Sequence, residues 1–364
     1  MSNNNTDTET VDRRVLFTPF YQENPYQEMY ESALRERGVS IIRLENPTPF
    51  SLPLLHAVRN RVDAVHFHWL HPFFLYGSKR WIYKIPGSKI ISYIAAIFFL
   101  IQVILLRYFC DSLVWTIHNT HNHEKRYLEL DYRLGQSVID RVDVVQVWDE
   151  NTASVVQEEY KVASSKIVVI PHGNFAPKYE PYSGQDPRAD LGIDSYDRVF
   201  MFFGMIRPYK NVPELIRAFN KMNSTNDCLL IAGNPMDDQM REEVVDAAST
   251  ANNILMDLRY IPDEQVPKYF AAADICVFSY ENIFNSGSVL LAMTFGTPFV
   301  APRMGSIPSV APEGNILYSD LASGLKKAHS LSQDDLERIG KINGLVASSN
   351  HSWDHIAEQT VRCY

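Results

Sequence analysis

The sequence predicts an α/β protein built from two doubly wound domains in tandem. Its 364 residues exceed the roughly 250–300 residues at which a single hydrophobic core stops growing, so two domains are expected. A composition of 46% hydrophobic and 21% charged residues is typical of a folded globular protein. Short apolar runs alternate with segments of helical spacing, which favours parallel sheets with helices on both faces. One turn-rich stretch interrupts this alternation and predicts a domain boundary.

The first domain is predicted at residues 13–178, after a polar tail at 1–12 that we expect to be disordered. This tail has no apolar core segment, so it resembles neither a signal peptide nor a transit peptide. The segment 26–38 has helical spacing and ends at Gly38. The apolar runs that predict the strands of one parallel sheet are 14–18, 39–42, 63–68, 113–118, 142–147 and 166–170.

The uncharged apolar run 90–106 departs from this pattern. As a helix it reaches only about 25 Å, whereas the hydrocarbon core of a bilayer is about 30 Å thick. Three interpretations stay open: a helix buried in the domain, a helix that spans a membrane, and a helix whose apolar face docks on a membrane surface. Docking is favoured because flanking cations can meet anionic head groups. These cations are Lys79, Arg80, Lys84, Lys89 and Arg107.

The second domain is predicted at 196–345, after a turn-rich linker at 179–195. Its predicted strands are 199–203, 228–232, 274–278 and 298–301, and its predicted helices are 213–220, 240–250, 263–271 and 288–295. The remaining segment, 346–364, contains an amphipathic stretch. We expect it to form a last helix that packs back on the first domain.

The charge balance and the cysteines exclude some classes of function. The net charge is −9, and no basic stripe with interleaved aromatic residues is present, so nucleic-acid binding is not expected. The four cysteines lie far apart, without the close pairing of a metal or redox motif. They are Cys110, Cys228, Cys276 and Cys363. We expect reduced thiols in a cytoplasmic protein.

Two loops of the second domain have the chemistry of a diphosphate site. Gly204 ends a predicted strand, and Arg207 and Lys210 follow it just before a helix, where cations can hold phosphate groups. The turn 285–288 opens an apolar helix, so its backbone N–H groups would face an anion. This turn consists of Asn285, Ser286, Gly287 and Ser288. The alternatives are a solvated basic loop and ordinary helix capping.

Histidines mark the carboxyl ends of strands in the first domain. His66 and His68 lie at the end of one predicted strand, and His118 ends another. Parallel sheets bind ligands beyond these ends. The three histidines are therefore candidate site residues.

Five segments follow one another along the chain: WTIHNTHNHE, PHGN, FFGMIRPYKNVPELIRAF, YIPDEQVPKYFAAADICVFSY and NSGSVLLAMTFGTPFVA. Taken in this order, they resemble the group 1, or family 4, glycosyltransferases of the GT-B fold. The likeness covers nearly the whole chain, and the segment 346–364 resembles the crossover helix of this family. The resemblance implies transfer of a sugar from a nucleotide-diphosphate donor, held by the second domain, to an acceptor held by the first.

The resemblance also implies roles for single residues. Arg207 and Lys210 would neutralise the leaving diphosphate, so neither a metal nor another cofactor is expected. The turn 285–288 would add backbone donors to the same phosphates. His118 matches the family's histidine near the donor sugar. His172, in PHGN, would lie at the entry to the cleft between the domains and contact the donor.

The sequence departs from the family at a pair of glutamates. Members commonly carry two glutamates separated by seven residues, whereas alignment back from Gly296 places Ile283 and Leu291 there. Glu281 is the nearest carboxylate and the candidate for the contact with the donor ribose. Ser309 likewise stands where the family has a glutamate. Since the pair is associated with retaining enzymes, the stereochemical outcome stays open.

An inverting reaction would need a general base for the acceptor hydroxyl. Glu124 and its neighbour His123 are the candidates, because they follow a strand end of the acceptor domain. The plain alternative is that both are surface residues. A zinc site of His118, His121 and His123 is less favoured, since no cysteine joins them.

These observations together predict a glycosyltransferase that moves a hexose from a UDP- or GDP-sugar to a lipid-linked or surface-polysaccharide acceptor. The apolar run and its cations are the reason to expect peripheral contact with the cytoplasmic face of the membrane. Three alternatives are a sugar phosphorylase, a nucleotide-sugar epimerase and a catalytically degenerate scaffold subunit. The retained phosphate-binding loops argue against the scaffold.

Overall fold

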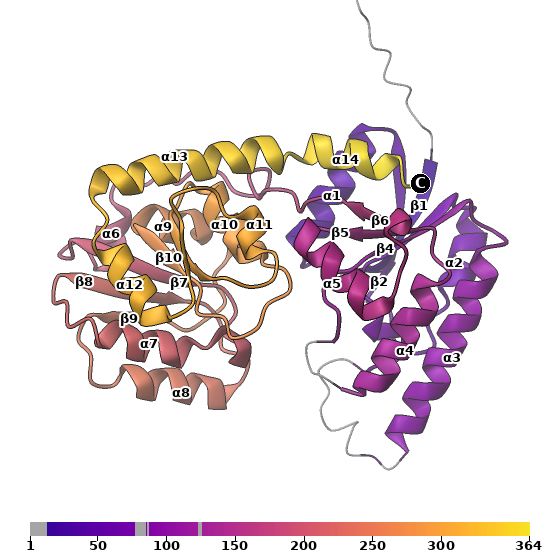
Figure 1. The fold of residues 1–364 in the computed structure, drawn as a ribbon, viewed down its shortest axis with the longest axis horizontal. Coiled ribbons are helices and arrows are strands. Elements are labelled where there is room, and N and C mark those ends of the chain that lie inside the picture. The colour runs from indigo at the N-terminus through magenta and orange to yellow at the C-terminus, as the bar shows by residue number, and fades with distance from the viewer. Residues whose placement is uncertain (1–12, 77–84, 86, 123–125) are drawn as a thin grey trace, which may run out of the picture. The chain divides into compact units, whose positions relative to one another are not determined.

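The computed structural model of the protein describes residues 13–76, 85, 87–122 and 126–364, and the chain forms two compact units (Figure 1). Unit 1 runs up to Gly173 and also includes Trp353–Tyr364, while unit 2 comprises Asn174–Ser352. The division was predicted after residue 178. One helix was predicted at 346–364, whereas the structure has the end of one helix, a break at His351 and a second helix there.

Asn174 explains this break. Its backbone N–H donates to the carbonyl oxygen of His351 at 2.8 Å. Its side-chain amide donates to the carbonyl oxygens of Ala347 at 2.9 Å and His351 at 3.0 Å. These bonds satisfy carbonyl groups that have no partner within a helix end. Helix α13 (Gln333–Asn350) therefore stops here, and α14 (Trp353–Val361) starts as an element of unit 1.

Unit 1 is a parallel six-stranded sheet in the order β2-β1-β3-β4-β5-β6, with helices packed on it (Figure 1). The order reverses between β1 and β3, and ligands of such sheets bind at this switch point. The strands are β1 (Arg13–Phe20), β2 (Val39–Glu45), β3 (Ala64–Phe67), β4 (Ser112–Thr116), β5 (Val144–Val147) and β6 (Ile167–Val169). The helices besides α14 are α1 (Pro25–Glu36), α2 (Pro53–Asn60), η1 (His71–Phe73), α3 (Ser88–Leu106), α4 (Leu128–Ile139), α5 (Glu150–Tyr160) and η3 (Ser164–Lys166).

Helix α14 is tied to the rest of unit 1 by polar contacts. Arg37, just after α1, forms an ion pair of 2.6 Å with Asp354. The hydroxyl of Ser112 in β4 donates to the carbonyl oxygen of Cys363 at 2.7 Å. The residues that follow α14 therefore reach the central strands of the sheet.

Unit 2 is a second parallel sheet, in the order β12-β11-β10-β7-β8-β9 (Figure 1). Its order reverses between β7 and β10, which is the switch point of a dinucleotide-binding fold. The strands are β7 (Arg198–Phe203), β8 (Asp227–Ala232), β9 (Ile254–Asp257), β10 (Ile275–Val277), β11 (Phe299–Pro302) and β12 (Ile316–Tyr318). The helices besides α13 are α6 (Pro187–Leu191), η4 (Pro208–Lys210), α7 (Val212–Asn220), α8 (Asp238–Ala248), η5 (Asp263–Gln265), α9 (Val266–Ala272), α10 (Gly287–Thr294), α11 (Ile307–Val310) and α12 (Leu321–His329). The predicted α/β class with two doubly wound domains is confirmed.

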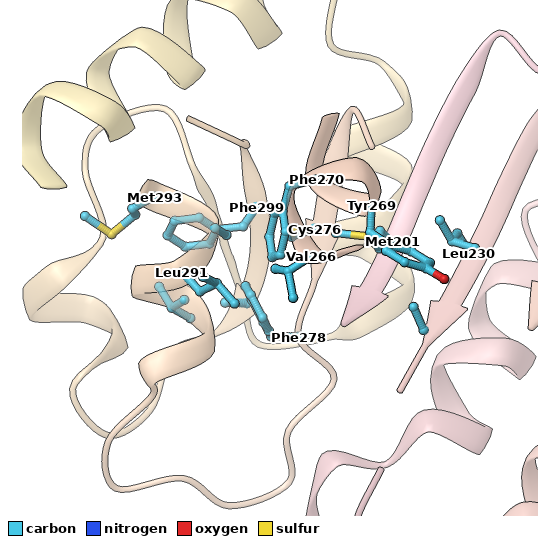
Figure 2. Packing of buried hydrophobic residues seen from close by; sticks show 14 of the residues in the cluster. Met201, Leu230, Val266, Tyr269, Phe270, Cys276, Phe278, Leu291, Met293 and Phe299 are labelled. Atoms are coloured by element: carbon cyan, nitrogen blue, oxygen red, sulfur yellow. The ribbon is translucent and has the colours of Figure 1, made fainter. Parts of the chain in front are cut away.

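One of the two cores of unit 2 lies between its sheet and helices α9 and α10 (Figure 2). Phe270 of α9 and Phe278, just after β10, are both buried there. Two of the four cysteines, Cys228 and Cys276, belong to the same core, and all four are free thiols. Cys228 and Cys276 therefore pack in this core as small apolar side chains.

The stretch predicted as a turn-rich linker contains a short helix, α6. Asp186 caps it by accepting from the backbone N–H groups of Arg188 and Ala189, and Gly192 ends it with a left-handed φ of 67°. Arg188 then forms an ion pair of 2.6 Å with Asp274. The linker is therefore packed on unit 2.

Helix α3, formed by the apolar run, has two different sides. Its inner side is buried and consists of Ser92, Ala95, Ala96, Phe99, Gln102, Val103 and Leu106. Its outer side exposes isoleucines four or three residues apart, with half or more of each accessible: Ile90, Ile94, Ile97 and Ile101. The interpretation as a buried helix therefore holds only for the inner side. Among the described residues α3 alone is long and apolar enough to cross a membrane, a test that core helices also pass.

Candidate active site

The anion site predicted in unit 2 lies at the switch point of its sheet. Gly204 follows β7 and has a φ of 112°, which favours glycine. A Cβ atom at this position would stand 3.4 Å from Nζ of Lys210 and 3.9 Å from Oγ of Ser288. The structure thus brings the two predicted loops together on either side of Gly204.

Lys210 is a buried cation without an acidic partner among the described residues. Lys210 is the last residue of η4 and is only 7% exposed. Its ammonium lies 5.7 Å from the ring centre of Phe202 and 5.9 Å from that of Tyr280. Burial, and to a smaller extent Arg207, lowers the pKa of Lys210 to about 8. A buried charge is costly unless it is paired, so this site favours a bound anion.

Arg207 lies three residues before Lys210, at the start of η4, and is half-buried. Its Nε donates to the sulfur of Met205 at 3.1 Å. Because the guanidinium group stays charged at any physiological pH, it adds a permanent positive charge to the loop. Arg207 and Lys210 together supply the two cations that a diphosphate needs.

The start of α10 forms the second side of this site. Ser286 caps the helix, because its hydroxyl accepts from the backbone N–H of Val289 at 3.3 Å. Tyr280, just after β10, is buried, and the side chains of Ser288 and Ser286 oppose the rise that burial causes in the pKa of its hydroxyl, so these serines lie beside it. Tyr280 is a residue that the sequence analysis missed. Its position after a strand of the switch point was the signal that could have found it.

The other predicted donor residues lie around this turn. Asn285 and Gly287 are half-buried beside Ser286, on the two sides of the helix start. Glu281 is exposed and accepts from the side-chain amide of Asn211 at 2.7 Å. The backbone N–H of Glu281 donates to the carbonyl oxygen of Tyr209 at 2.8 Å, which joins the β10 loop to η4.

The positions of the missing glutamates have structural roles. Leu291 is buried in the core of unit 2, between α10 and the sheet (Figure 2). The carbonyl oxygen of Ile283 lies 2.3 Å from where a Cβ atom of residue 305 would be, so only Gly305 fits there. Ser309 is exposed in α11. None of these positions places a carboxylate near Lys210.

The histidines of unit 1 form a buried row at the carboxyl edge of its sheet. Nδ1 of His66 lies 2.7 Å from the hydroxyl of Tyr364, and Nε2 lies 2.6 Å from Oγ1 of Thr116. Nδ1 of His68 lies 3.2 Å from Nε2 of His118. The rings of His66 and His68 are stacked, with centroids 4.5 Å apart.

Aromatic side chains surround His118, and one of them, Tyr26, also contacts His172. The ring of Tyr26 in α1 lies 5.3 Å from His118 and 4.5 Å from His172. Trp69 stacks on His118 at 4.3 Å. Both histidines therefore belong to one cluster within unit 1, and α14 adds Trp353 to it, 5.8 Å from Tyr26. Only the histidines of this cluster were predicted.

The row is electrically neutral near pH 7. Burial, helped by His118, lowers the pKa of His66 to about 3. Burial and the neighbouring histidines also bring the pKa values of His68 and His118 well below the usual range. A neutral imidazole has one donor and one acceptor nitrogen. Unit 1 thus offers uncharged hydrogen-bonding groups where unit 2 offers cations.

The predicted general bases cannot be placed, since Glu124 and His123 lie outside the described residues. His121 is described, and its Nε2 lies 3.2 Å from a carboxylate oxygen of Glu159. In the described part of the chain no three histidine, cysteine, aspartate or glutamate side chains are grouped as a metal site would require.

Comparisons with known proteins agree with this geometry. The family described as "Glycosyl transferases group 1" matches residues 197–334. The "GDP-mannose:glycolipid 4-beta-D-mannosyltransferase" of Xanthomonas campestris pv. campestris is 31% identical over 351 residues, which cover 90% of each chain. Among solved structures, sucrose-phosphate synthase of Thermosynechococcus elongatus has a TM-score of 0.72 at 15% identity. Anabaena HepE in complex with UDP has the same TM-score at 14% identity, and each comparison covers 96% of this chain and 98% of the other.

The two structural likenesses show the fold, and the mannosyltransferase shows the family, because its identity extends over almost all of both chains. The chain therefore belongs to the group 1 glycosyltransferases and is a nucleotide-sugar-dependent glycosyltransferase of the GT-B fold.

Proposed function

We propose that this enzyme transfers a hexose from a UDP- or GDP-sugar to a hydroxyl of a lipid-linked or surface-polysaccharide acceptor at the cytoplasmic face of the membrane. The observation that carries the proposal is the buried ammonium of Lys210, which has no described carboxylate partner and lies against Gly204 at a sheet switch point. A nucleotide diphosphate supplies the anion that this site lacks.

In the proposed reaction the bond between the anomeric carbon and the diphosphate oxygen breaks, and the acceptor oxygen bonds to that carbon. The acceptor hydroxyl loses its proton to a base, and the diphosphate leaves with the bonding electrons. Lys210 and Arg207 stabilise the negative charge that develops on the diphosphate. The N–H groups at the start of α10 add to this stabilisation. We propose that these groups do the work that a divalent ion does in other transferases.

The donor is tested with a panel of UDP- and GDP-sugars, by measuring binding and slow donor hydrolysis of the full chain in the presence of EDTA. GDP-mannose is the first member, because the mannosyltransferase that covers this chain has that donor in its name. We expect one donor to be preferred and EDTA to have no effect. Absence of binding for every donor contradicts the proposal, and loss of binding in EDTA contradicts its metal-free form.

The proposed membrane surface is the outer side of α3 together with α2 and residues 50–52 before it. Gln102 of α3 fixes the start of α2, because it donates to the carbonyl oxygen of Ser51 at 3.1 Å and accepts from the N–H of Leu54 at 3.3 Å. The exposed apolar residues of this surface are Phe50, Leu52, Leu55, Val58, Ile90, Ile91, Ile94, Ile97, Ile101, Ile104 and Leu105. An apolar surface of this extent marks an interaction site.

The charge of this surface favours a lipid bilayer as the partner. Neither α2 nor α3 contains an acidic residue. The exposed Lys89 is the second residue of α3, and Arg107, which forms an ion pair of 3.2 Å with Asp143, follows the helix. Cations at the edge of an apolar surface attract anionic head groups while the apolar side chains enter the interface. Lys79, Arg80 and Lys84 lie outside the described residues and carry no weight here.

The membrane surface is tested by replacing Ile94, Ile97 and Ile101 with serine and measuring sedimentation with vesicles that contain anionic phospholipid. Because these side chains are half exposed, the variant should keep its thermal stability but leave the vesicles. Leu345→Ser is the matched control, since Leu345 is 68% exposed on α13 of unit 2. Equal vesicle binding by the variant, or none by the wild type, contradicts the proposal. Unfolding of the variant would instead identify a core helix.

A further inference from the structure

A narrow polar pocket lies in unit 1 at the carboxyl edge of the sheet, beside the histidine row. Residues that follow β3, together with residues of β4, α4 and α5, form its walls, among them His68, Trp69, Trp115, His121, Asp131 and Tyr160. The open space inside is about 30 Å³. This admits about one or two water molecules, or a hydroxyl group of a ligand.

Three buried polar atoms in these walls have no hydrogen-bond partner in the described part of the chain. They are Nε2 of His68, Nε1 of Trp115 and Nδ1 of His121. His68 is 1% exposed and Trp115 is 5% exposed. A buried polar group without a partner is destabilising, so three of them at one pocket indicate an occupant that satisfies them.

Asp131, in the first turn of α4, adds a half-used carboxylate. Its Oδ2 accepts from the backbone N–H of Asn122 at 2.7 Å and from the side-chain amide of Asn122 at 2.8 Å. No donor to its Oδ1 is found among the described residues. Burial raises the pKa of Asp131, while the bonds from Asn122 oppose this shift. Asn122 therefore satisfies Oδ2 of Asp131, and Oδ1 is left to accept from a ligand in the pocket.

The atoms of the pocket fit a hydroxyl group better than an ion. The indole Nε1 of Trp115 only donates. Oδ1 of Asp131 accepts, and Nδ1 of His121, whose Nε2 lies 3.2 Å from a carboxylate oxygen of Glu159, adds a polar atom to the pocket. A hydroxyl both donates and accepts, whereas an anion would be repelled by Asp131 and a cation would meet the N–H of Trp115.

The walls of the pocket are fixed by packing. A Cβ atom at Gly135 of α4 would lie 2.9 Å from the ring of Tyr160, so glycine lets this ring lie against the helix. The hydroxyl of Tyr160 then donates to the carbonyl oxygen of Thr120 at 2.7 Å, which holds the loop after β4. Trp69 stacks on His118 beside the pocket, and an aromatic face of this kind can support the C–H side of a sugar ring.

We propose that this pocket binds a hydroxyl of the acceptor saccharide, with Oδ1 of Asp131 accepting the O–H and Nε1 of Trp115 donating to its oxygen. The inference rests on the proposed glycosyl transfer and assigns acceptor recognition to residues 119–122 after β4 and to the start of α4. A structural water molecule is the competing occupant. Substitution of the polar side chains in the wall separates these occupants, because it weakens saccharide binding only if a saccharide hydroxyl occupies the pocket.

The test is saturation-transfer NMR of the full chain with methyl glycosides of glucose, mannose, galactose and N-acetylglucosamine in both anomeric forms. Methyl glycosides have no alkyl chain that would bind to α3. We expect one of them to bind, and we expect Asp131→Asn and Trp115→Phe each to weaken its binding about tenfold or more, because a hydrogen bond in a buried site is lost. Asp140→Asn, an exposed position at the end of the same helix, should leave binding unchanged.

Nucleotide-diphosphate binding is measured on the same samples and separates this inference from the proposed function. Binding of a nucleotide by all variants, with equal glycoside affinity in wild type, Asp131→Asn and Trp115→Phe, would overturn the pocket and leave a structural water as its occupant. Absence of binding of every glycoside to the wild type would overturn it too. Glycoside binding without any nucleotide binding counts against the donor assignment instead. If Asp131→Asn fails to fold, Trp115→Phe decides, since it removes only the N–H and part of the ring.

Discussion

The two units place their polar residues at the same kind of sheet edge but use opposite chemistry there. Unit 2 holds two cations, Arg207 and Lys210, beside the start of α10, with no described carboxylate paired to Lys210. Unit 1 holds a row of neutral histidines among aromatic rings. The folds of the sheets are similar, so the difference comes from the residues that follow the strands.

This contrast teaches that strand-end loops, rather than the sheet, set the charge of a site. A cationic loop is suited to a diphosphate, which is charged before and after transfer. A neutral row is suited to sugar hydroxyls, which gain little from a fixed charge but need directed hydrogen bonds. It follows that the two units should respond differently to substitution and to pH.

The largest expected effect is on unit 2. Lys210→Ala should lower kcat/KM for the preferred donor by roughly 100-fold or more, about 3 kcal/mol, because one stabilising group for the leaving diphosphate is lost. Steady-state kinetics of donor hydrolysis measure this. Lys221→Ala is the control, since Lys221 is exposed at the end of α7 in the same unit. Equal rates for the two variants would remove the phosphate role from Lys210.

The next effect concerns the stability of unit 1. The pKa of His66 is about 3 in the folded chain, against an unperturbed value near 6.5, so the unfolded chain binds more protons between these values. Stability is therefore full above about pH 6.5 and falls on acidification, and His66 alone accounts for a loss of about 2 kcal/mol at pH 5.

The measurement is urea unfolding at pH 7 and pH 5, followed by tryptophan fluorescence. All five tryptophans of the sequence fall within the residue range of unit 1, so the signal reports on this unit. His66→Gln should lose about 2 kcal/mol of the pH dependence. His355→Gln should retain it, because His355 is exposed on α14. An unchanged pH dependence in His66→Gln would mean that the row is not neutral.

A smaller effect, of opposite direction in pH, is expected in unit 2. Since burial lowers the pKa of Lys210 to about 8, the free site loses its charge as the pH rises through this value. Donor affinity should be constant below about pH 8 and then fall, approaching tenfold per pH unit. Calorimetric titration between pH 7.5 and 9.5 measures it. Lys210→Arg should give a flat profile, because the guanidinium stays charged, and an inflection retained in this variant would assign it to another group.

The fold could be predicted largely from apolar runs. The strands that were missed have a physical explanation. The central strands are buried on both faces and therefore read as continuous apolar segments. Strands β9 and β12 were missed because their apolar runs, 254–256 and 316–318, are only three residues long, and so short a run does not distinguish a strand from other structure. Both strands lie at the edges of their sheet, and Leu255 and Met256 of β9 are exposed there.

The site was predicted where its residues are close in sequence and missed where the fold brings them together. Lys210 and Ser286 were found because each lies in a loop with its own chemical signature. No such signature marks Tyr280, which lies beside Ser286, or Tyr26 and Tyr364 of unit 1. Tyr364 reaches His66 only because α14 packs within unit 1, nearly 300 residues along the chain from its partner.

The smallest expected effect tests this long-range contact and the neutral character of unit 1 together. Tyr364→Phe removes the hydroxyl that lies 2.7 Å from Nδ1 of His66. A hydroxyl can donate or accept, so it fits either tautomer of a neutral imidazole, and its loss should cost about 1 kcal/mol of unfolding free energy, as for an uncharged hydrogen bond.

Tryptophan-monitored urea unfolding at pH 7 measures this loss, with Tyr108→Phe as the control because Tyr108 is 80% exposed. A loss of 3 kcal/mol or more would be expected only if the hydroxyl were bonded to a charged imidazolium, since bonds to charged groups are stronger by about a factor of two. Nucleotide binding at Lys210 should not change. A small loss confined to unit 1 therefore supports the contrast between a neutral and a cationic site, and a large one breaks it.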